Sequence, residues 1–486
     1  MLSSTTEDEL KEGKELSVTE RLAQAVVETD FGQMPPEAIS LAKQAILDCL
    51  GVTLAGSVTP TGQVITEFVK ELGGEPQAIV LGSSFRTSAP NAALANGTMA
   101  HALDYDDGNH PMYGHPSAPV LPVVLALGEK QRVSGKEVLE AYLLGFEVEV
   151  KLGREMNMDH YEKGWHATGT LGTMGATTAA AKILKLNVEK TRTAFGIAVS
   201  LAAGTRANFG TMTKPFHAGN AARNGIVAAT LAHKGFTANL DGLDGPWGFS
   251  HLLGNDALDL SRIVGDFGNP FEIVHSGVTI KQYPCCGGSH PSIDAILHLV
   301  DTYGFSAEDV RAIECGVNQI VPQVLAYPEP TTGLEAKFSL QYCVAVALLD
   351  RKVRLDHFTN GKVDDAEIRE LLKRITMYVH SDVENDPDFA SIVTVKLRDG
   401  REYSHRVDKA RGRPSVPLSK AELHTKYRDC ARGALHKEDI ERSLKLVENL
   451  ETLEDITVLV NTLLVPPNAA CRVPAPSLVK DIGKKG

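Results

Sequence analysis

Between about residues 17 and 275 the sequence is a nearly unbroken series of helical segments whose apolar residues occur on most sides of each helix. A helix that is apolar nearly all round is buried among neighbouring helices. Glycine and alanine are frequent in these segments and aromatic residues make up only 6% of the chain, so we expect closely packed helix backbones. The patterns predict a large helical domain with helices over residues 90–103, 117–133, 136–153, 168–186, 190–203 and 218–234.

The sequence changes in character after about residue 275. Residues 392–398 and 401–407 alternate between apolar and polar side chains, and Asp399-Gly400 between them is typical of a hairpin turn. Helices are predicted at 334–350 and 364–379, and the chain becomes helical again from 419 to 464. The 486 residues suffice for two or three domains. We therefore expect a mainly α fold that contains an α/β insertion.

The expected boundaries follow from these changes of pattern. They are 17–275 and 416–465 for the helical parts, 276–415 for the α/β insertion, and 1–16 and 466–486 for terminal tails.

Composition and charge exclude several classes of partner. The formal charge of −12 repels phosphodiester backbones, and no long run of Lys and Arg offsets it, so we expect no nucleic-acid partner. No stretch approaches 18 uninterrupted apolar residues, which predicts no membrane partner. The first residues lack the basic start and apolar stretch of a signal peptide, and the seven Cys form no short-spaced disulfide framework. We expect a cytoplasmic protein.

Two clusters of polar residues lie in the first half of the chain. The segment from His101 to His115 contains three Asp and three His, which could bind a divalent metal, transfer protons or cap a helix. The segment from His160 to Thr170 contains Tyr161 and His166 beside one of only two Trp in the chain. His166 could reach a pocket or could simply precede the next helix.

Two further clusters contain lysines. Residues 204–220 form a Gly- and Thr-rich segment before the helix predicted at 218, and Lys214 within it could bind an anion such as a carboxylate or could be a solvated surface residue. Residues 279–290 contain Lys281 and the adjacent Cys285 and Cys286, which do not have the spacing of a Cys-x-x-Cys metal site. Cys286 could be a nucleophile or a small group lining a pocket.

Together the clusters provide His, Lys and Asp side chains but no nucleotide-binding motif. Such a set suits proton transfer next to a substrate carboxylate, with cations balancing the substrate's charge. A metal-dependent phosphohydrolase is an alternative, although Leu103 precedes Asp104, so the adjacent His-Asp pair of helical hydrolases is missing. A non-catalytic helical binding module is another.

The four clusters, in this order, resemble the MmgE/PrpD family. The matching motifs are Asp104-Tyr-Asp-Asp107 through His115-Pro-Ser, Gly164-Trp-His-Ala-Thr, Met212-Thr-Lys-Pro-Phe-His-Ala-Gly-Asn and Lys281-Gln-Tyr-Pro-Cys-Cys-Gly. The resemblance implies a helical domain formed by both ends of the chain, a smaller inserted α/β lid domain, and a homodimer. It implies a lyase, a dehydratase or decarboxylase, that acts on a small di- or tricarboxylate without metal or organic cofactor. An epimerase of a dicarboxylate is the nearest alternative.

The resemblance also assigns residues to the site. It places Asp104, His115 and His166 in the pocket. Because an imidazole titrates near neutrality, His115 and His166 are expected to transfer protons, and Asp104 to orient an imidazole or to hold it protonated. The resemblance implies that His101, His110 and His217 lie outside the immediate pocket. Two positions differ from an animal member of the family, which has Thr at position 108 and His at position 286. The expected substrate-binding residues are Lys214, Lys281, Tyr161, Cys286 and Gly108.

Overall fold

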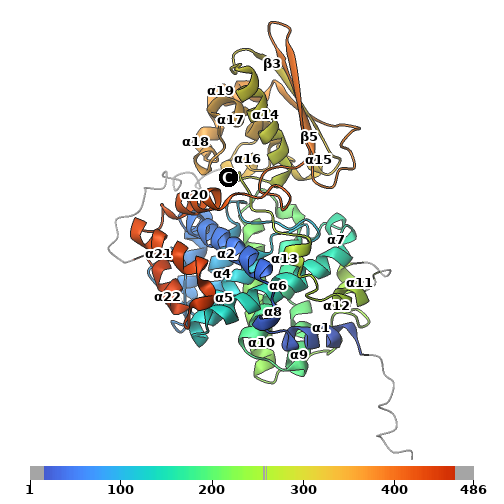
Figure 1. Cartoon of the computed structure of the whole chain (residues 1–486), viewed down its shortest axis with the longest axis vertical. Helices are drawn as coiled ribbons and strands as arrows, with labels where there is room; N and C mark the ends of the chain where they lie inside the picture. The colour runs from blue at the N-terminus through green and yellow to red at the C-terminus, as the bar shows by residue number, and fades with distance from the viewer. Residues whose placement is uncertain (1–15, 255–257, 259, 466–486) are drawn as a thin grey trace, which may run out of the picture.

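The computed structural model describes residues 16–254, 258 and 260–465, so the predicted tails lie outside the described residues except for Leu16. The chain is mostly helical, which confirms the mainly α prediction. A helical body occupies the lower part of Figure 1 and an α/β lobe lies above it. Two hydrophobic cores correspond to them, one drawn from residues 22–280 and 418–463 and the other from residues 283–397.

The helical body contains most of the predicted helices. The central pair, α4 and α10, is closely packed: a Cβ atom on Gly97 of α4 would lie 2.8 Å from the Cα of Gly219 in α10. This contact confirms the expected close approach of helix backbones. The elements of the first part of the body are α1 (Val18–Glu28), α2 (Pro36–Ser57), α3 (Pro60–Leu72), β1 (Ala78–Ile79), β2 (Arg86–Thr87), α4 (Ala89–His101), α5 (Ser117–Gln131), α6 (Gly135–Met156), α7 (Asp159–Glu162), α8 (Ala167–Ile183), α9 (Val188–Val199), α10 (Thr213–His233), α11 (Phe249–Leu253), α12 (Ser261–Gly265) and α13 (Glu272–His275).

One of these helices, α2, is long and apolar enough to cross a membrane by length and composition alone, yet 72% of its apolar window is buried inside the fold. It packs against α4, α6 and a helix near the end of the described chain, α20 (Lys420–Ala431), so its composition is that of a core helix.

The α/β lobe is built around a sheet with strand order β4-β3-β5-β6, in which β3 pairs parallel to β4 and antiparallel to β5. The predicted hairpin is confirmed: β5 and β6 pair on either side of Asp399-Gly400, and Gly400 has a φ of 91° that favours glycine. The elements of the lobe are α14 (His290–Tyr303), β3 (Val310–Val317), α15 (Val321–Val324), α16 (Gly333–Ala336), α17 (Leu340–Asp350), α18 (Asn360–Val363), α19 (Ala366–Leu372), β4 (Ile375–Val379), β5 (Ser391–Leu397) and β6 (Glu402–Val407).

Two helices expected in this lobe differ from the structure. The helix predicted at 364–379 ends at Leu372, and Ile375–Val379 form strand β4, whose β-branched residues pair with β3. The helix predicted at 334–350 is divided into α16 and α17, because Ser339 adopts an extended conformation and its side chain caps α17.

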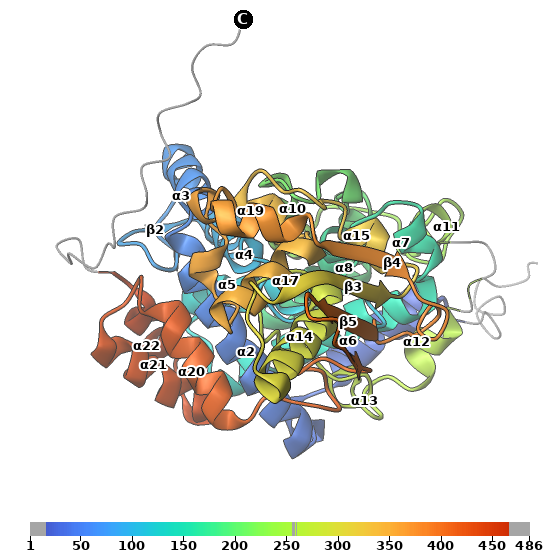
Figure 2. The same ribbon diagram turned by 90° about the horizontal axis from the view of Figure 1, so that it is seen from above.

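The chain returns to the helical body through α20 (Lys420–Ala431), α21 (Lys437–Glu448) and α22 (Thr457–Val460). Helix α20 packs beside α2, although the two are separated by more than 360 residues in sequence (Figure 1). Viewed from above, β3, β5, α14 and α17 lie over the helices of the body (Figure 2). The α/β lobe therefore lies on one side of the helical body.

Candidate active site

A cavity of about 150 Å³ lies at the junction of the helical body and the α/β lobe. The volume suits a small molecule, since drug-sized ligands occupy pockets of several hundred Å³. Residues from all four polar clusters line it. The body contributes Asp104, Gly108, Asn109, His110, Tyr113, Gly114, His115, Tyr161, His166, Phe209 and Lys214, and the rest of the chain contributes Thr279, Lys281, Cys286, Gly287, Gly288, His290, Ile320, Val324, Phe338, Phe389, Ala410, Arg411 and Arg413.

Backbone hydrogen bonds hold three distant segments together at this cavity. The backbone N–H groups of Gly108 and Thr279 each donate to the other residue's carbonyl, at 2.9 and 2.8 Å. The N–H of Ile280 donates to the carbonyl of Gly412 at 2.9 Å. Gly412 has a φ of +89° and a Cβ atom there would lie 1.9 Å from the carbonyl oxygen of Ile280, so this approach requires glycine.

Asp104 is the carboxylate on which both predicted substrate-binding lysines converge. It follows the end of α4 with a φ of 51°, an uncommon conformation for a residue other than glycine. The Lys281 ammonium donates to its Oδ2 at 2.9 Å, and the Lys214 ammonium donates to its Oδ1. Burial favours the neutral carboxyl, but the two ammonium groups outweigh burial and hold the pKa of Asp104 well below its usual range. The site thus holds two cations against one anion.

Lys214 reaches this position from the first turn of α10, which begins at Thr213, whereas the sequence predicted its start at 218. The Gly- and Thr-rich segment is therefore partly helical, and Lys214 is buried with 4% of its surface exposed. This excludes the alternative of a solvated surface lysine.

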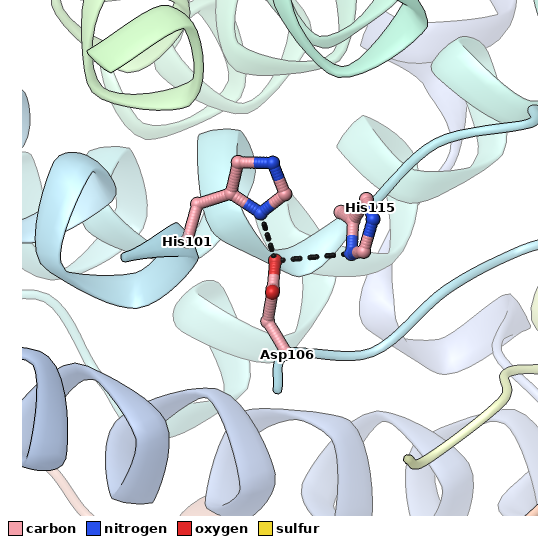
Figure 3. Close-up of side chains that lie close together, drawn as sticks. All are labelled: His101, Asp106 and His115. Atoms are coloured by element: carbon pink, nitrogen blue, oxygen red, sulfur yellow. Dashed lines mark hydrogen bonds and ion pairs between the residues drawn. The ribbon is translucent and has the colours of Figure 1, made fainter. Parts of the chain in front are cut away.

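His101, Asp106 and His115 lie close together (Figure 3); His101 and Asp106 are buried, and His115 lines the cavity. His101 Nδ1 donates to Asp106 Oδ2 at 2.8 Å, and His115 Nδ1 lies 3.2 Å from the same oxygen. The His115 Nε2 atom lies 3.9 Å from Asp104 Oδ1. Burial opposes ionisation of Asp106, but the two imidazoles outweigh it and hold the pKa of Asp106 well below its usual range. His115 therefore contacts both buried carboxylates.

Asp107, the third Asp of the cluster, has a structural role. Its side chain accepts hydrogen bonds from the backbone N–H and hydroxyl of Ser117, at 3.2 and 2.6 Å, and so caps the start of α5. Burial raises the pKa of Asp107 to about 8. The helix-capping interpretation of this segment is thus correct for one Asp of the three.

His166 immediately precedes α8 and lies against a second histidine. Its Nδ1 is 3.0 Å from Nδ1 of His217, so one of the two donates to the other, and its ring stacks on His101 with centroids 5.5 Å apart. Burial, together with the neighbouring imidazoles and Lys214, lowers the pKa of His166 well below its usual range. Burial lowers the pKa of His217 to about 4. Both imidazoles are therefore neutral near pH 7.

The remaining predicted residues also border the cavity. Tyr161, in α7, is buried and its ring is stacked by Arg206, whose guanidinium carbon lies 3.9 Å from the ring centroid. Burial raises the pKa of the Cys286 thiol to about 11, which favours a pocket-lining thiol over a nucleophilic thiolate. A Cβ atom on Gly108 would meet only the carbonyl of Gly114, at 3.7 Å, so the cavity has room for a side chain there.

The structure corrects one expectation and adds residues that sequence reasoning missed. His110, which the resemblance placed outside the pocket, lines the cavity, and its Nε2 donates to the carbonyl of Pro387. Phe209, Phe338 and Arg413 also line it. Phe209 lies within the 204–220 cluster, whereas Phe338 and Arg413 lie outside the four clusters and no spacing in the sequence connects them to the clusters.

The His101–Asp106–His115 cluster is a group of three ligand-type side chains among the described residues whose ligand atoms lie within 4.8 Å of one another. Imidazole and carboxylate ligands at this separation could hold a divalent cation. The same atoms, however, are already at hydrogen-bonding distance, with both Nδ1 atoms directed at one Asp106 oxygen (Figure 3). Asp106 thus holds His101 by a hydrogen bond and lies at ion-pair distance from His115.

Comparisons with known proteins cover most of the chain. Residues 20–260 match the MmgE/PrpD N-terminal domain and residues 283–452 match the MmgE/PrpD C-terminal domain. The chain is 33% identical over 478 residues to the cis-aconitate decarboxylase of Homo sapiens, which covers 94% of this chain and 97% of that protein. It is 33% identical over 469 residues to the enzyme of the same name from Mus musculus, covering 93% and 94%. It is 25% identical over 461 residues to the cis-aconitate decarboxylase of Aspergillus terreus, covering 89% and 93%. The chain belongs to the MmgE/PrpD family.

Proposed function

We propose that this protein is a lyase that decarboxylates cis-aconitate, a small tricarboxylate. The observation that carries the proposal is the convergence of Lys214 and Lys281 on Asp104 beside His115, in a cavity sized for a small acid. Two ammonium groups with one carboxylate leave a net positive charge for an anionic substrate. The three relatives described above are cis-aconitate decarboxylases, which favours this reaction over the epimerase alternative.

The proposed reaction needs one proton and no redox partner. The bond between the CH₂ carbon and its carboxylate breaks and carbon dioxide leaves. The released electron pair forms a new C=C bond to the central carbon. The electrons of the original C=C bond then take up a proton at the carbon that carries the other terminal carboxylate. Lys214 and Lys281 stabilise the charge that develops toward the retained carboxylates.

His115 is the proposed proton donor. It lines the cavity, with Nδ1 3.2 Å from Asp106 Oδ2 and Nε2 3.9 Å from Asp104 Oδ1, so the ring lies beside two carboxylates. His166 is neutral and would hydrogen-bond the substrate. In a dehydratase or an epimerase the same neutral imidazole would instead remove a proton from the substrate. His166 would therefore be a hydrogen-bonding group in the decarboxylation and a general base in the alternative reactions.

We also propose that the α/β lobe acts as a lid and that the protein is a homodimer. Lys281 and Cys286 belong to the segment that enters the lobe, whereas Lys214 and His166 belong to the body, so the site is complete only when the two parts are together. Closing the lobe over the substrate would exclude water from the carbanion.

Light scattering tests whether the protein is a dimer. X-ray scattering with and without a saturating tricarboxylate tests closure of the lobe, and unchanged scattering curves contradict that closure.

The experiment that tests the function is a turnover assay against a panel of small di- and tricarboxylates, read by mass spectrometry. Decarboxylation lowers the substrate mass by one carbon dioxide, dehydration by one water, and epimerisation leaves it unchanged. We expect loss of carbon dioxide from cis-aconitate and from no dicarboxylate. A panel in which only water is lost, or in which no mass changes, contradicts the proposal.

A further inference from the structure

The charges at Asp104 do not balance a tricarboxylate. Lys214 and Lys281 provide two positive charges and Asp104 removes one, so the pair leaves one net charge for a substrate that carries three carboxylates. An uncompensated carboxylate in a buried cavity is costly. The other two cations that line the cavity are Arg411 and Arg413. Arg411 is half exposed and ion-paired with Glu422, which leaves Arg413.

Arg413 is held at the cavity by the backbone contact described above. Gly412, the residue before it, pairs with Ile280, so Arg413 lies beside the strand-like segment that carries Lys281. Its side chain is 11% exposed, and its guanidinium carbon lies 5.4 Å from the centroid of the Phe389 ring. Phe389 also lines the cavity, and it has a φ of 62°. The aromatic ring thus supports one face of the guanidinium and leaves its edge for a ligand.

Most of the hydrogen-bonding capacity of Arg413 is unused within the part of the chain that the structure describes. A guanidinium has five N–H donors. In Arg413 one of them is used: Nη2 donates to the carbonyl of Asp388 at 3.1 Å. The Asp388 carboxylate is 3.9 Å from Nη1, and its other oxygen lies 3.0 Å from the Lys409 ammonium. Arg413 thus shares the Asp388 carboxylate with Lys409, and its remaining N–H groups are available to an anion in the cavity.

We propose that Arg413 binds the third carboxylate of the substrate and thereby selects tricarboxylates over dicarboxylates. The planar guanidinium can donate two parallel hydrogen bonds to one carboxylate, which a lysine cannot do. This inference rests on the proposed function, because it assigns one carboxylate of that substrate. Under this proposal, the loop after β6 distinguishes substrates with three carboxylates from those with two. This loop is more than 130 residues from Lys281 in the sequence.

The test is a binding experiment with three unreactive acids: propane-1,2,3-tricarboxylate and the two dicarboxylates that lack one of its carboxylates, propane-1,2-dicarboxylate and propane-1,3-dicarboxylate. Isothermal titration calorimetry gives the Kd of each for the wild-type protein and for Arg413→Gln, Arg413→Lys and Asp388→Asn. Arg406→Gln is the control for net charge, since Arg406 lies on the exposed side of β6 and pairs with Asp408. Circular dichroism checks that each variant is folded.

We expect Arg413→Gln to raise the Kd of the tricarboxylate by about 10- to 100-fold, as for a lost hydrogen bond to a charged group. The Kd of at least one dicarboxylate should stay within about threefold of its wild-type value. Arg413→Lys should recover part of the loss. Asp388→Asn and Arg406→Gln should not weaken the tricarboxylate. In addition, the KM for cis-aconitate should rise more than kcat falls in Arg413→Gln.

Three results would overturn the inference. An unchanged Kd for the tricarboxylate removes Arg413 from the binding site while leaving the proposed function intact. An equal loss of affinity for all three acids in Arg413→Gln, with the same loss in Asp388→Asn, means that Arg413 only holds the Asp388–Phe389 loop in place. A wild-type protein that binds none of the three acids contradicts the proposed substrate class itself, and the inference fails with it.

Discussion

Lys281 holds Asp104 by two of its hydrogen bonds, one to the side-chain Oδ2 at 2.9 Å and one to the backbone carbonyl at 2.8 Å. The two residues are 177 positions apart and belong to different polar clusters. Because the second bond is to the backbone, the ammonium fixes the loop after α4 as well as the carboxylate. A change at Lys281 therefore alters both the charge of the cavity and the position of its wall.

The two lysines should contribute directly to catalysis. Changing Lys214 or Lys281 to Met is expected to cost about 2–4 kcal/mol of transition-state stabilisation, because an oriented charged donor is lost from a buried site. The measurement is kcat/KM for each variant, with Lys373→Met as control, since Lys373 is exposed. Losses below about tenfold for both variants would remove the lysines from the site.

The two pocket histidines should both be needed for catalysis, His115 as the proton donor and His166 as a neutral hydrogen-bonding partner of the substrate. His115→Ala and His166→Ala are each expected to reduce kcat by at least ~100-fold. His298→Ala, a change at an exposed histidine of α14, should leave kcat unchanged. Near-normal kcat in both pocket variants, together with loss of activity in His110→Ala or His217→Ala, would show that other histidines transfer the proton.

The neighbouring Asp106 and Asp107 should respond differently to the same substitution. Asp106→Asn removes the carboxylate that orients His101 and His115, and we expect kcat to fall by about 10- to 100-fold. Asp107→Asn should have a small effect, because burial raises the pKa of Asp107 to about 8 and the side chain is thus mainly neutral at pH 7. Equal losses in the two variants would contradict these separate roles.

Catalysis should not require a metal. We expect full activity after exhaustive chelation and a substoichiometric metal content, because Asp106 already accepts a hydrogen bond from His101 and lies 3.2 Å from Nδ1 of His115. Metal analysis of the purified protein measures this directly. A stoichiometric transition metal, with activity lost on chelation and restored by that metal, would favour a metal-dependent enzyme built on the His101–Asp106–His115 cluster.

Glu149 should make the protein less stable as the pH rises. It is fully buried in α6, with no hydrogen-bond partner for either oxygen among the described residues, and burial raises its pKa well above its usual range. Because the pKa of Glu149 is raised in the folded state, the neutral carboxyl contributes its full stabilisation below the unfolded-state pKa of about 4.5. This contribution to the free energy of unfolding is lost as the pH rises from there toward the folded-state pKa.

Glu149→Gln should therefore flatten the decline in the free energy of unfolding above that pH, by up to about 1.4 kcal/mol per pH unit. Urea unfolding at several pH values measures the effect. Parallel curves for the wild-type protein and the variant would contradict it.

Much of the helical body could be predicted from the sequence because each helix carries its own pattern of apolar residues and glycines. Strand β4 could not, because Ile375–Val379 become a strand only by pairing with β3, more than 55 residues earlier. In the site, the clusters around Asp104, His166, Lys214 and Lys281 were recognisable as dense groups of polar residues.

The contacts of Arg413 and His110 could not be foreseen in the same way. Arg413 reaches the cavity because Gly412 pairs with Ile280, and His110 is fixed by the carbonyl of Pro387. Both contacts join segments that are far apart in the chain, so no local spacing predicts them.

The most direct test of the proposed function is proton NMR of the turnover of cis-aconitate in D₂O. The mechanism predicts a product that has lost one carboxylate and carries a single solvent deuteron, on the carbon next to a retained carboxylate. His115→Ala should slow the appearance of this product at an unchanged protein fold. Consumption of cis-aconitate with all three carboxylates retained, or a deuteron exchanged into unreacted substrate without loss of carbon dioxide, would contradict it.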